Sequence, residues 1–325
     1  MSDNDNTINH LYSHKLLFMK RMTNYFFLTL IVFSTGLLTS CGKFGDFIDR
    51  DHPKGSKGHV YTMSNTTEMN SILIFKQDAD GNLTYKKAVA SGGAGKGMGL
   101  GSQGSLILDK HYKWMYAVNA ANNTISSFKV SEDGDLTLHQ TISSGGIMPV
   151  SLTTHKSLLY VVNSGGNICG FKIGSDGWLS KLEGSSRPLS SGMAMPAEIL
   201  FKPGGSLLVV TEKATNKIVT YQLNGEGVAQ SPVFHPAEAE TPFGFVFAGS
   251  EHLIVTDAFG GMPGKSAVTS FSVNGSNVHL KSNIRINQTA ACWVVLTKQE
   301  HFAYVTNTGS NSISSLEVRP DGTLH

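Results

Sequence analysis

The feature of this sequence that most constrains its fold is an internal repeat. Six segments share one pattern: an apolar run that ends in a polar residue, a second run in which apolar and polar residues alternate, and a glycine-containing turn. Each second run holds one bulky anchor residue, and consecutive anchors lie 43 to 53 residues apart. The anchors are Phe75, Phe128, Phe171, Tyr221, Phe271 and Leu316. A repeat of this length indicates a fold built from copies of one supersecondary unit.

Each repeat is predicted to contain strands and no helices. The runs 158–163 (LLYVVN) and 207–211 (LLVVT) are short and rich in β-branched residues, as in strands buried on both faces. The runs 123–130 and 217–223 alternate more strongly, as in strands nearer the surface. A further apolar run precedes this pair of strands in five repeats, at 105–109, 149–154, 197–201, 243–247 and 292–297. With a last strand after the turn, each unit has four strands.

Four antiparallel strands repeated roughly every 40 to 50 residues are typical of a propeller blade. The sequence therefore predicts an all-β protein, a β-propeller of four-stranded antiparallel blades; a β-sandwich or two barrels of similar hairpins explain six copies less well. The first repeat lacks a convincing first strand, and the last stops at Leu324 and His325, where its fourth strand should begin. About 22 strands are expected, so either the chain is truncated at its C-terminus or a six-bladed ring closes imperfectly.

The N-terminal region has the features of an address signal. Lys20 and Arg21 precede the apolar run 26–38, which is about the length of a signal peptide and short for a membrane span. Small residues lead to Cys41, and this ending resembles the lipobox of bacterial lipoproteins. The resemblance implies cleavage before Cys41 and lipidation of that residue, which tethers a protein without a transmembrane helix. A short membrane anchor or a buried helix is the alternative.

These features predict a division of the chain into three parts. Residues 1–40 are a signal peptide whose true start is Met19 or Met22, residues 41–58 are a lipid-attached flexible tether, and residues 59–325 are the propeller. The expected location is the bacterial cell envelope, anchored by lipid and facing the periplasm, more readily on the outer membrane than on the inner one. We expect a monomer.

Composition and motif searches exclude several classes of protein. Lys and Arg total 26 against 24 Asp and Glu, with no basic run outside the N-terminus, so a nucleic-acid partner is not expected. Besides Cys41, only Cys169 and Cys292 remain, and neither a CxxC motif nor a His pair at ligand spacing supports a metal. No GxSxG elbow is present. The spacing of Gly99, Gly101 and Gly104 matches the dinucleotide-binding fingerprint GxGxxG. These glycines precede a predicted strand, however, and the fingerprint requires a helix there, so a dinucleotide site is not predicted. No cofactor or metal is predicted.

Propeller topology gathers one polar residue per blade on a single face, because the second strand of every blade ends there. These residues are Asn65, Asn119, Asn163, Glu212, Asp257 and Asn307. The Asn and Asp side chains have a simple structural interpretation, since such residues hydrogen-bond their own turns. Glu212 and Lys213 depart from the pattern and are less easily explained as turn formers.

A catalytic interpretation of this ring assigns each member a role. Glu212 or Asp257 would be the general base for water, while Lys213, with Asn163 and Asn119, would stabilise an oxyanion. Substrate-binding groups would be Asn119, Asn163, Asn307 and Gln103; Gln103 lies in a glycine-rich crossover that is expected to approach the central channel. Trp293 is expected to pack in the core, and Cys292 lacks a nearby base for a role as a nucleophile.

Several stretches resemble one family. Segments 99–106 (GLGSQGSL), 209–218 (VVTEKATNKI), 241–249 (TPFGFVFAG), 256–261 (TDAFGG) and 289–297 (TAACWVVLT) are similar to the lactonase family of β-propellers. That family includes 6-phosphogluconolactonase-like proteins, and its members are often labelled 3-carboxymuconate cyclase. The resemblance spans 59–325 and implies a seven-bladed propeller without a required metal, of which about six blades are present. It implies hydrolysis or cyclisation of a sugar-acid or muconate lactone.

Two other functions stay open at this point. A non-enzymatic propeller could use the polar ring to bind a peptide, a glycan or an envelope protein, and a periplasmic address favours this because phosphorylated sugar lactones are cytoplasmic. An inactive, partial protein is the third hypothesis.

Overall fold

The computed structural model describes residues 58–325. The lipidation, signal-peptide and tether predictions, Cys41 among them, lie outside these residues. None of the helices in the described part is both long and apolar enough to cross a membrane. The part described here is built from 23 strands and one short 3₁₀ turn at Phe259–Gly261.

The strands form six separate antiparallel sheets, which we number 1 to 6 in chain order. Sheet 1 contains β1 (Gly58–Met63), β2 (Ser71–Gln77) and β3 (Leu83–Ala90). Sheet 2 contains β4 (Leu106–Leu108), β5 (Trp114–Asn119), β6 (Thr124–Val130) and β7 (Leu136–Ser143). Sheet 3 contains β8 (Pro149–His155), β9 (Leu158–Asn163), β10 (Asn167–Ile173), β11 (Leu179–Lys181) and β12 (Arg187–Pro188).

The second half of the chain repeats this arrangement. Sheet 4 contains β13 (Pro196–Phe201), β14 (Leu207–Glu212), β15 (Lys217–Gln222) and β16 (Val233–Pro236). Sheet 5 contains β17 (Pro242–Ala248), β18 (His252–Asp257), β19 (Ala267–Asn274) and β20 (Asn277–Arg285). Sheet 6 contains β21 (Ala291–Leu296), β22 (Phe302–Asn307) and β23 (Ser312–Glu317).

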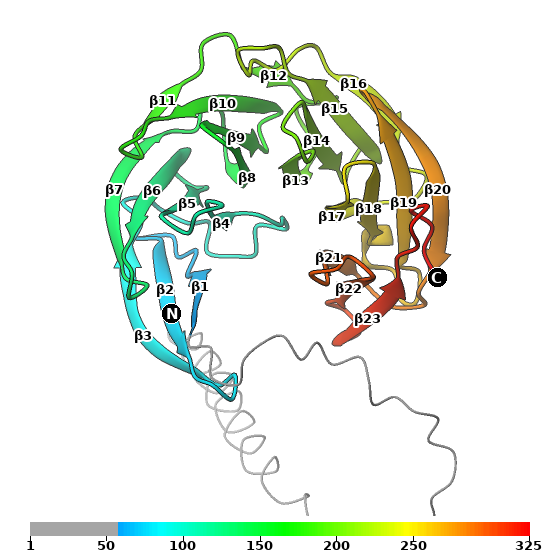
Figure 1. Cartoon of the computed structure of the whole chain (residues 1–325), viewed down its shortest axis with the longest axis horizontal. Coiled ribbons are helices and arrows are strands. Elements are labelled where there is room, and N and C mark those ends of the chain that lie inside the picture. The colour runs from blue at the N-terminus through cyan, green and yellow to red at the C-terminus, as the bar shows by residue number, and fades with distance from the viewer. Residues whose placement is uncertain (1–57) are drawn as a thin grey trace, which may run out of the picture. The chain divides into compact units, whose positions relative to one another are not determined.

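The sheets are arranged around a common axis, so the propeller prediction is confirmed. The strands β4, β8, β13, β17 and β21 lie nearest the axis, the last strands of the sheets lie at the periphery, and sheets 1 and 6 are the two ends of the arc (Figure 1). Sheet 1 has three strands because it lacks the innermost one, and sheet 6 has three because an isolated bridge from Val318 to Leu324 stands where a fourth would begin. Both shortfalls agree with the sequence analysis.

The hydrophobic core is divided among the interfaces between neighbouring sheets. Five clusters of buried side chains fill the five interfaces from sheet 1 to sheet 6 in turn. The cluster between sheets 3 and 4, for example, includes Tyr160, Ile168, Val210 and Tyr221, all of them fully buried. Each inner sheet is therefore apolar on both faces, which is why its strands show continuous apolar runs.

One contact recurs at four of these interfaces. The side chain at the start of the second strand of one sheet lies over the glycine in the last hairpin of the next sheet, so that a Cβ at Gly177, for example, would lie 2.3 Å from the Trp114 ring. We call the first partner the knob and the second the hairpin glycine. The pairs are His59 and Gly134, Trp114 and Gly177, Leu158 and Gly227, and His252 and Gly322.

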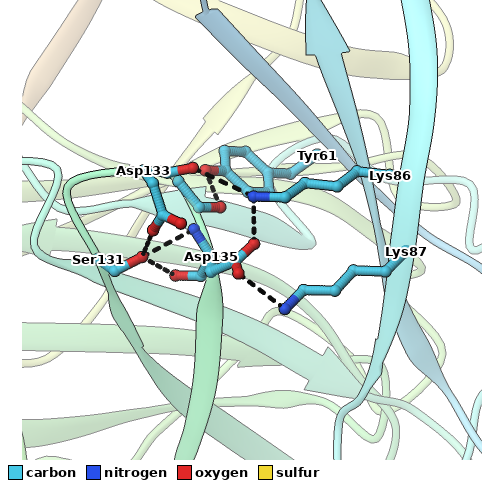
Figure 2. Close-up of polar contacts among 7 residues, drawn as sticks. Tyr61, Lys86, Lys87, Ser131, Asp133 and Asp135 are labelled. Carbon is cyan, nitrogen blue, oxygen red and sulfur yellow. Dashed lines mark hydrogen bonds and ion pairs between the residues drawn. The ribbon is translucent and has the colours of Figure 1, made fainter.

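The interface between sheets 1 and 2 adds polar contacts to this packing. The Tyr61 hydroxyl donates a 2.8 Å hydrogen bond to the Gly134 carbonyl. The ammonium groups of Lys86 and Lys87 both pair with the carboxylate of Asp135, the second at 3.0 Å (Figure 2). The hydrogen bond from Lys86 is the main reason why the pKa of Asp135 is lowered. These are partly exposed pairs, which typically add little to stability.

Candidate functional site

Five of the six predicted ring residues end the second strand of their sheet. They are Asn119, Asn163, Glu212, Asp257 and Asn307, and their side chains are buried. The prediction for the sixth residue, Asn65 of sheet 1, was wrong. Ser64 pairs with Ser71 as Asn119 pairs with Thr124, so Ser64 occupies the position that was assigned to Asn65. Asn65 follows with a φ of 51° and binds the crossover after sheet 1, where its amide oxygen accepts from the Lys96 backbone N–H.

Asn119 joins two sheets. Its amide oxygen accepts hydrogen bonds from Asn70 at 3.1 Å and from Ser91 at 2.6 Å, and both of those residues belong to the part of the chain around sheet 1. Its amide nitrogen donates to Thr124 and Ser126 within sheet 2. Every bonding position of the Asn119 side chain therefore has a partner in the protein, and the arrangement holds the ends of two neighbouring blades together.

Asn163 and Asn307 are less fully paired. Neither amide atom of the Asn163 side chain has a partner, although both are buried. Asn307 donates to Ser312 and Ser314, while its buried amide oxygen has no partner. Buried polar atoms are rarely left unpaired. A water or a ligand atom that bound beside Asn163 or Asn307 would therefore form a hydrogen bond that the protein itself does not supply.

Glu212 is held by the crossover that precedes its own sheet. One carboxylate oxygen accepts the Ser190 backbone N–H at 2.8 Å, and the other accepts the hydroxyls of Ser190 and Thr215. The side chain is fully buried. In sheet 4 this longer side chain thus makes an interblade contact comparable to that of Asn119, and Glu212 is not among the residues that line the cavity described below.

Asp257 is also fully buried and has one partner. Its Oδ2 accepts the Thr269 hydroxyl at 2.5 Å, and its Oδ1 has none. Desolvation raises the pKa of this carboxyl well above its ordinary value, and the hydrogen bond from Thr269 opposes the shift only in part. Because this buried carboxyl is bonded to Thr269 and is not among the residues that line the cavity, it is poorly placed to accept a proton from a water there.

The crossover from sheet 1 to sheet 2 reaches inward to the centre of the ring, as its glycines predicted (Figure 1). The Gln103 side chain bonds the backbone N–H and the carbonyl of Val294 on β21, both at 3.3 Å, and its own backbone N–H donates to Ala197 on β13. Gly104 is required here, because a Cβ would lie 2.9 Å from the Ser151 hydroxyl and the residue has a φ of +78°. Gln103 is thus placed at the axis, where it acts as a tie between sheets.

Lys213 is the charged side chain at the edge of this centre. Its Nζ donates to the Gly101 carbonyl and lies 4.6 Å from the centroid of the Phe243 ring. Burial lowers the pKa of Lys213 to about 8. The carbonyl and the face of the aromatic ring both favour a cation, and they orient the ammonium group beside the glycine-rich crossover.

A cavity of about 960 Å³ is lined by Gly101 and Phe243, the two residues that Lys213 contacts, whereas Lys213 itself is not among the lining residues. One side is formed by the axial crossovers, with Gly101, Ser102, Thr241, Phe243 and Gly260. The other side is formed by the end sheets, with residues of β1 such as Tyr61 and Met63 facing residues of β21 and β22 such as Trp293 and Thr306. A volume of this size is ordinary for a small-molecule site. No carboxylate and no imidazole is among the described residues that line it.

Two features of the centre were missed or misjudged in the sequence. Glu198 on β13 is almost fully buried, its Oε2 accepts the Phe245 backbone N–H at 2.7 Å, and desolvation raises its pKa well above the ordinary value. A polar residue inside the apolar run 197–201 was the available signal. Trp293 was expected in the core, but it is 51% exposed and lines the cavity.

The remaining reactive groups do not cluster. Cys169 is buried and Cys292 is partly buried, and both are free thiols. Cys292 lines the cavity, where its Sγ lies 2.8 Å from the Thr308 hydroxyl oxygen and 3.5 Å from that of Thr306. Between Gly58 and His325 no group of three His, Cys, Asp or Glu residues is arranged to hold a metal ion.

Known structures share this architecture. A candidate 6-phosphogluconolactonase from Bacteroides uniformis is 18% identical, with 84% of this chain and 82% of that one covered and a TM-score of 0.66. A second, from Bacteroides fragilis, is 20% identical (84% and 80% covered, TM-score 0.63). A periplasmic gluconolactonase from Pseudomonas aeruginosa is 12% identical (82% and 80% covered, TM-score 0.64). At these identities the likeness shows the fold. No curated protein matches the sequence.

The fold and the axial cavity define the class of protein: an all-β propeller with a small-molecule-sized cavity at its centre. Residues 52–183 match the family model described as lactonase, 7-bladed beta-propeller. This part of the chain is therefore similar to that family, and the later sheets continue the same propeller fold.

Proposed function

We propose that this propeller hydrolyses the ring of a sugar-acid lactone in the axial cavity, and that the ammonium group of Lys213 stabilises the oxyanion formed in the reaction. The observation that carries the proposal is the position of the Lys213 ammonium, held by the Gly101 carbonyl and the Phe243 ring, both at the cavity wall. The names of the structural neighbours, which include a gluconolactonase and candidate 6-phosphogluconolactonases, agree with this substrate class.

The chemistry needs one water and no redox partner. The water oxygen attacks the lactone carbonyl carbon, the carbonyl oxygen becomes negative, and the bond from that carbon to the ring oxygen then breaks. The ring oxygen takes a proton and the product is a hydroxy acid, which releases a proton at neutral pH. An ammonium in a site partly shielded from water stabilises the developing oxyanion, and this is the role we assign to Lys213.

The predicted general bases are not placed for this reaction. Glu212 is occupied by Ser190 and Thr215, and Asp257 is bonded to Thr269, so neither carboxylate lines the cavity. We therefore propose electrostatic catalysis by Lys213 on an ester that water already attacks readily. Asn163 and Asn307 each have an unpaired buried amide atom, but neither lines the cavity, so we assign them no contact with the lactone.

Base uptake at constant pH tests the proposal. Wild-type protein should release acid from glucono-δ-lactone faster than buffer does, and Lys213→Met should reduce the enzymatic rate by about 100-fold, as expected for one lost oxyanion donor. Lys265→Met is the matched control, because Lys265 is an exposed lysine that does not line the cavity. A muconolactone run in parallel tests the other substrate class.

A second function is favoured by the absence of an acid or base from the described cavity wall. The propeller would then bind a small molecule, a glycan or an envelope protein without turning it over. Saturable binding of the lactone by calorimetry, together with a hydrolysis rate equal to that of buffer, would support this function and remove the first.

We also propose that Cys41 carries a lipid anchor on the periplasmic side of a bacterial membrane, as the sequence around it predicts. Wild-type protein should enter the detergent phase of a two-phase extraction, and Cys41→Ser protein should stay in the aqueous phase. Wild-type protein found in the aqueous phase would contradict the anchor.

A further inference from the structure

A second cavity, of about 590 Å³, lies between sheets 3 and 4. Its walls are the turn before β9, the end of β10, the turn before β14 and the hairpin after β15. The ring residues Asn163 and Glu212 end the strands β9 and β14, whereas this cavity lies where the two strands begin. No described residue lines both this cavity and the axial one. The second cavity is therefore separate from the proposed lactone site.

Positive charge exceeds negative charge on the wall of the second cavity. Lys156 lies in the turn before β9, and Lys172 lies near the end of β10. Neither lysine forms an ion pair within residues 58–325. Glu226, in the hairpin after β15, is the one carboxylate among the described residues of the wall. The two ammonium groups are therefore available to a negatively charged ligand.

His155, which also lines the second cavity, lies close to these positive charges. Its pKa is lowered mainly by burial, and the charges of Lys156 and Lys110 lower the pKa further. Lys110 belongs to the turn before β5 of sheet 2, so lysines from two sheets act on the same imidazole. An anion bound beside His155 would be attracted by the same charges that disfavour a proton there.

The turns around the second cavity have several backbone N–H groups that are not used within the protein. In the described part of the chain, these groups donate to no acceptor at Lys156, Ser157, Gly204, Ser206 and Gly225, all of which line the cavity. Free N–H groups of turns are common ligands of anions. The backbone therefore adds neutral donors to the two ammonium groups.

The side chains of the wall add further donors and few acceptors. The hydroxyl groups of Ser157 and Ser206 form no hydrogen bond within residues 58–325. The amide oxygen of Asn224 is occupied, because it accepts the backbone N–H groups of Glu226 at 3.0 Å and of Val228 at 2.9 Å. Its amide nitrogen remains as a donor. A wall rich in donors and positive charge suits a ligand with negative charge and several acceptor oxygens.

We propose that the second cavity binds the phosphate group of a small, soluble phosphate monoester. Such a group has a charge of about −1.5 to −2 near pH 7 and three strong acceptor oxygens. Its charge matches the two unpaired ammonium groups, and its oxygens can accept hydrogen bonds from the turns on either side. A carboxylate offers only one charge and two oxygens. The volume of about 590 Å³ leaves room for the organic part of the ligand. The proposal is independent of lactone hydrolysis.

Calorimetry with glycerol 3-phosphate as the probe tests the proposal. The probe is titrated into the full-length chain at pH 7 and low ionic strength, in a buffer without phosphate. We expect saturable binding with a Kd below about 1 mM, and weaker binding as salt is added, because exposed charges are screened. Glycerol, which lacks the phosphate, is the matched control ligand and should not bind.

Two lysines at equivalent positions provide a matched pair of variants. Lys172→Met removes one ammonium group from the wall and should weaken binding about five- to tenfold. Lys129→Met is the control: Lys129 pairs with the first residue of β5 as Lys172 pairs with the first residue of β9, and it is exposed but does not line the second cavity. Lys156→Met provides a second cavity variant if Lys172→Met unfolds, which circular dichroism checks.

Glu226 provides a variant with the opposite sign. Its carboxylate is exposed and repels a phosphate bound at the same wall. Glu226→Gln removes the charge and keeps the size of the side chain, so the Kd for glycerol 3-phosphate should fall about two- to fivefold. Tighter binding by this variant and weaker binding by Lys172→Met together would locate the phosphate in the second cavity.

Three results would overturn the proposal. The first is no saturable binding of glycerol 3-phosphate up to about 10 mM. The second is equal affinity of the Lys172→Met and Lys129→Met variants for the probe. The third is binding to phosphatidylglycerol vesicles that Lys172→Met weakens, without any binding of glycerol 3-phosphate, since this would assign the cavity to a lipid headgroup and not to a soluble monoester.

Discussion

Gln103 and Val294 lie 191 residues apart in the sequence and are joined at the centre of the ring by two hydrogen bonds of 3.3 Å. The Gln103 amide group donates to the carbonyl of Val294 and accepts a hydrogen bond from its N–H. The side chain therefore pairs both backbone groups of this residue of β21, as a residue of an adjacent strand would. Because the same residue donates its own N–H to Ala197, one crossover ties sheet 6 to sheet 4. The glycines that precede Gln103 allow this close approach.

Replacing Gln103 should destabilise the ring. Gln103→Leu removes both bonds and leaves the backbone groups of Val294 unpaired, at an expected cost of about 1 to 3 kcal/mol. Urea denaturation followed by fluorescence measures the change. Gln230→Leu is the control, since Gln230 is exposed and its side chain bonds only the nearby Val228 carbonyl. Equal midpoints for the two variants would show that the tie contributes nothing.

Two glycines with the same left-handed backbone conformation should differ in how much stability is lost when each is replaced by alanine. Gly177 and Gly81 have φ values of +83° and +86°, but only Gly177 lies under a knob, the Trp114 ring. Gly81→Ala should cost about 1 to 2 kcal/mol from the left-handed backbone. Gly177→Ala should cost about 1 to 3 kcal/mol more because it overpacks the interface. The free energies of unfolding of the two variants measure this difference, and equal losses would mean that the knob contact is not tight.

The buried carboxyl of Glu198 should make the protein less stable as the pH rises. Desolvation raises its folded-state pKa above the unfolded value, so the native state binds more protons than the unfolded one between the two. Stability then falls as the pH rises above the unfolded pKa of about 4.3, with a slope of up to about 1.4 kcal/mol per pH unit for one group.

Glu198→Gln removes this titration and keeps an acceptor for the Phe245 N–H. The variant should therefore gain stability relative to wild type at pH 7 and lose most of that advantage at pH 4. Thermal melts at both pH values measure this difference. A constant difference between the two proteins across the range would mean that Glu198 does not titrate in this window.

Much of the fold could be predicted because the six copies of one pattern can be compared with each other, so a strand that is clear in one copy locates its counterpart in the others. The positions of the second strands, the shortfall in sheets 1 and 6, and the face on which Asn119 and Glu212 lie all followed from the register of one pattern. The error at Asn65 has a local cause: the strand ends one residue earlier than in the other sheets, and Ser64 replaces the usual Asn.

The candidate site was harder to predict, because it depends on the direction in which each side chain points at the end of a strand, and neighbouring residues can point to different surroundings. Glu212 and Lys213 are neighbours in the sequence, yet the first is buried against the Ser190 crossover and the second reaches the cavity wall. Glu198 was overlooked because it lies within an apolar run. Trp293 was misplaced because an aromatic residue in an inner strand is usually covered by the next sheet, and sheet 6 has none among the described residues.

The pH dependence of kcat/KM for glucono-δ-lactone tests the central claim most directly. Burial lowers the pKa of Lys213 to about 8, and the ammonium form is the one that stabilises an oxyanion. The enzymatic rate, after subtraction of the buffer rate, should therefore be constant below pH 7 and fall tenfold per pH unit well above 8, as expected for the loss of one proton. Lys213→Arg, whose charge persists, should remove the fall. A rate that stays constant or rises between pH 7 and 9.5, or that is unchanged in Lys213→Met, would contradict the account.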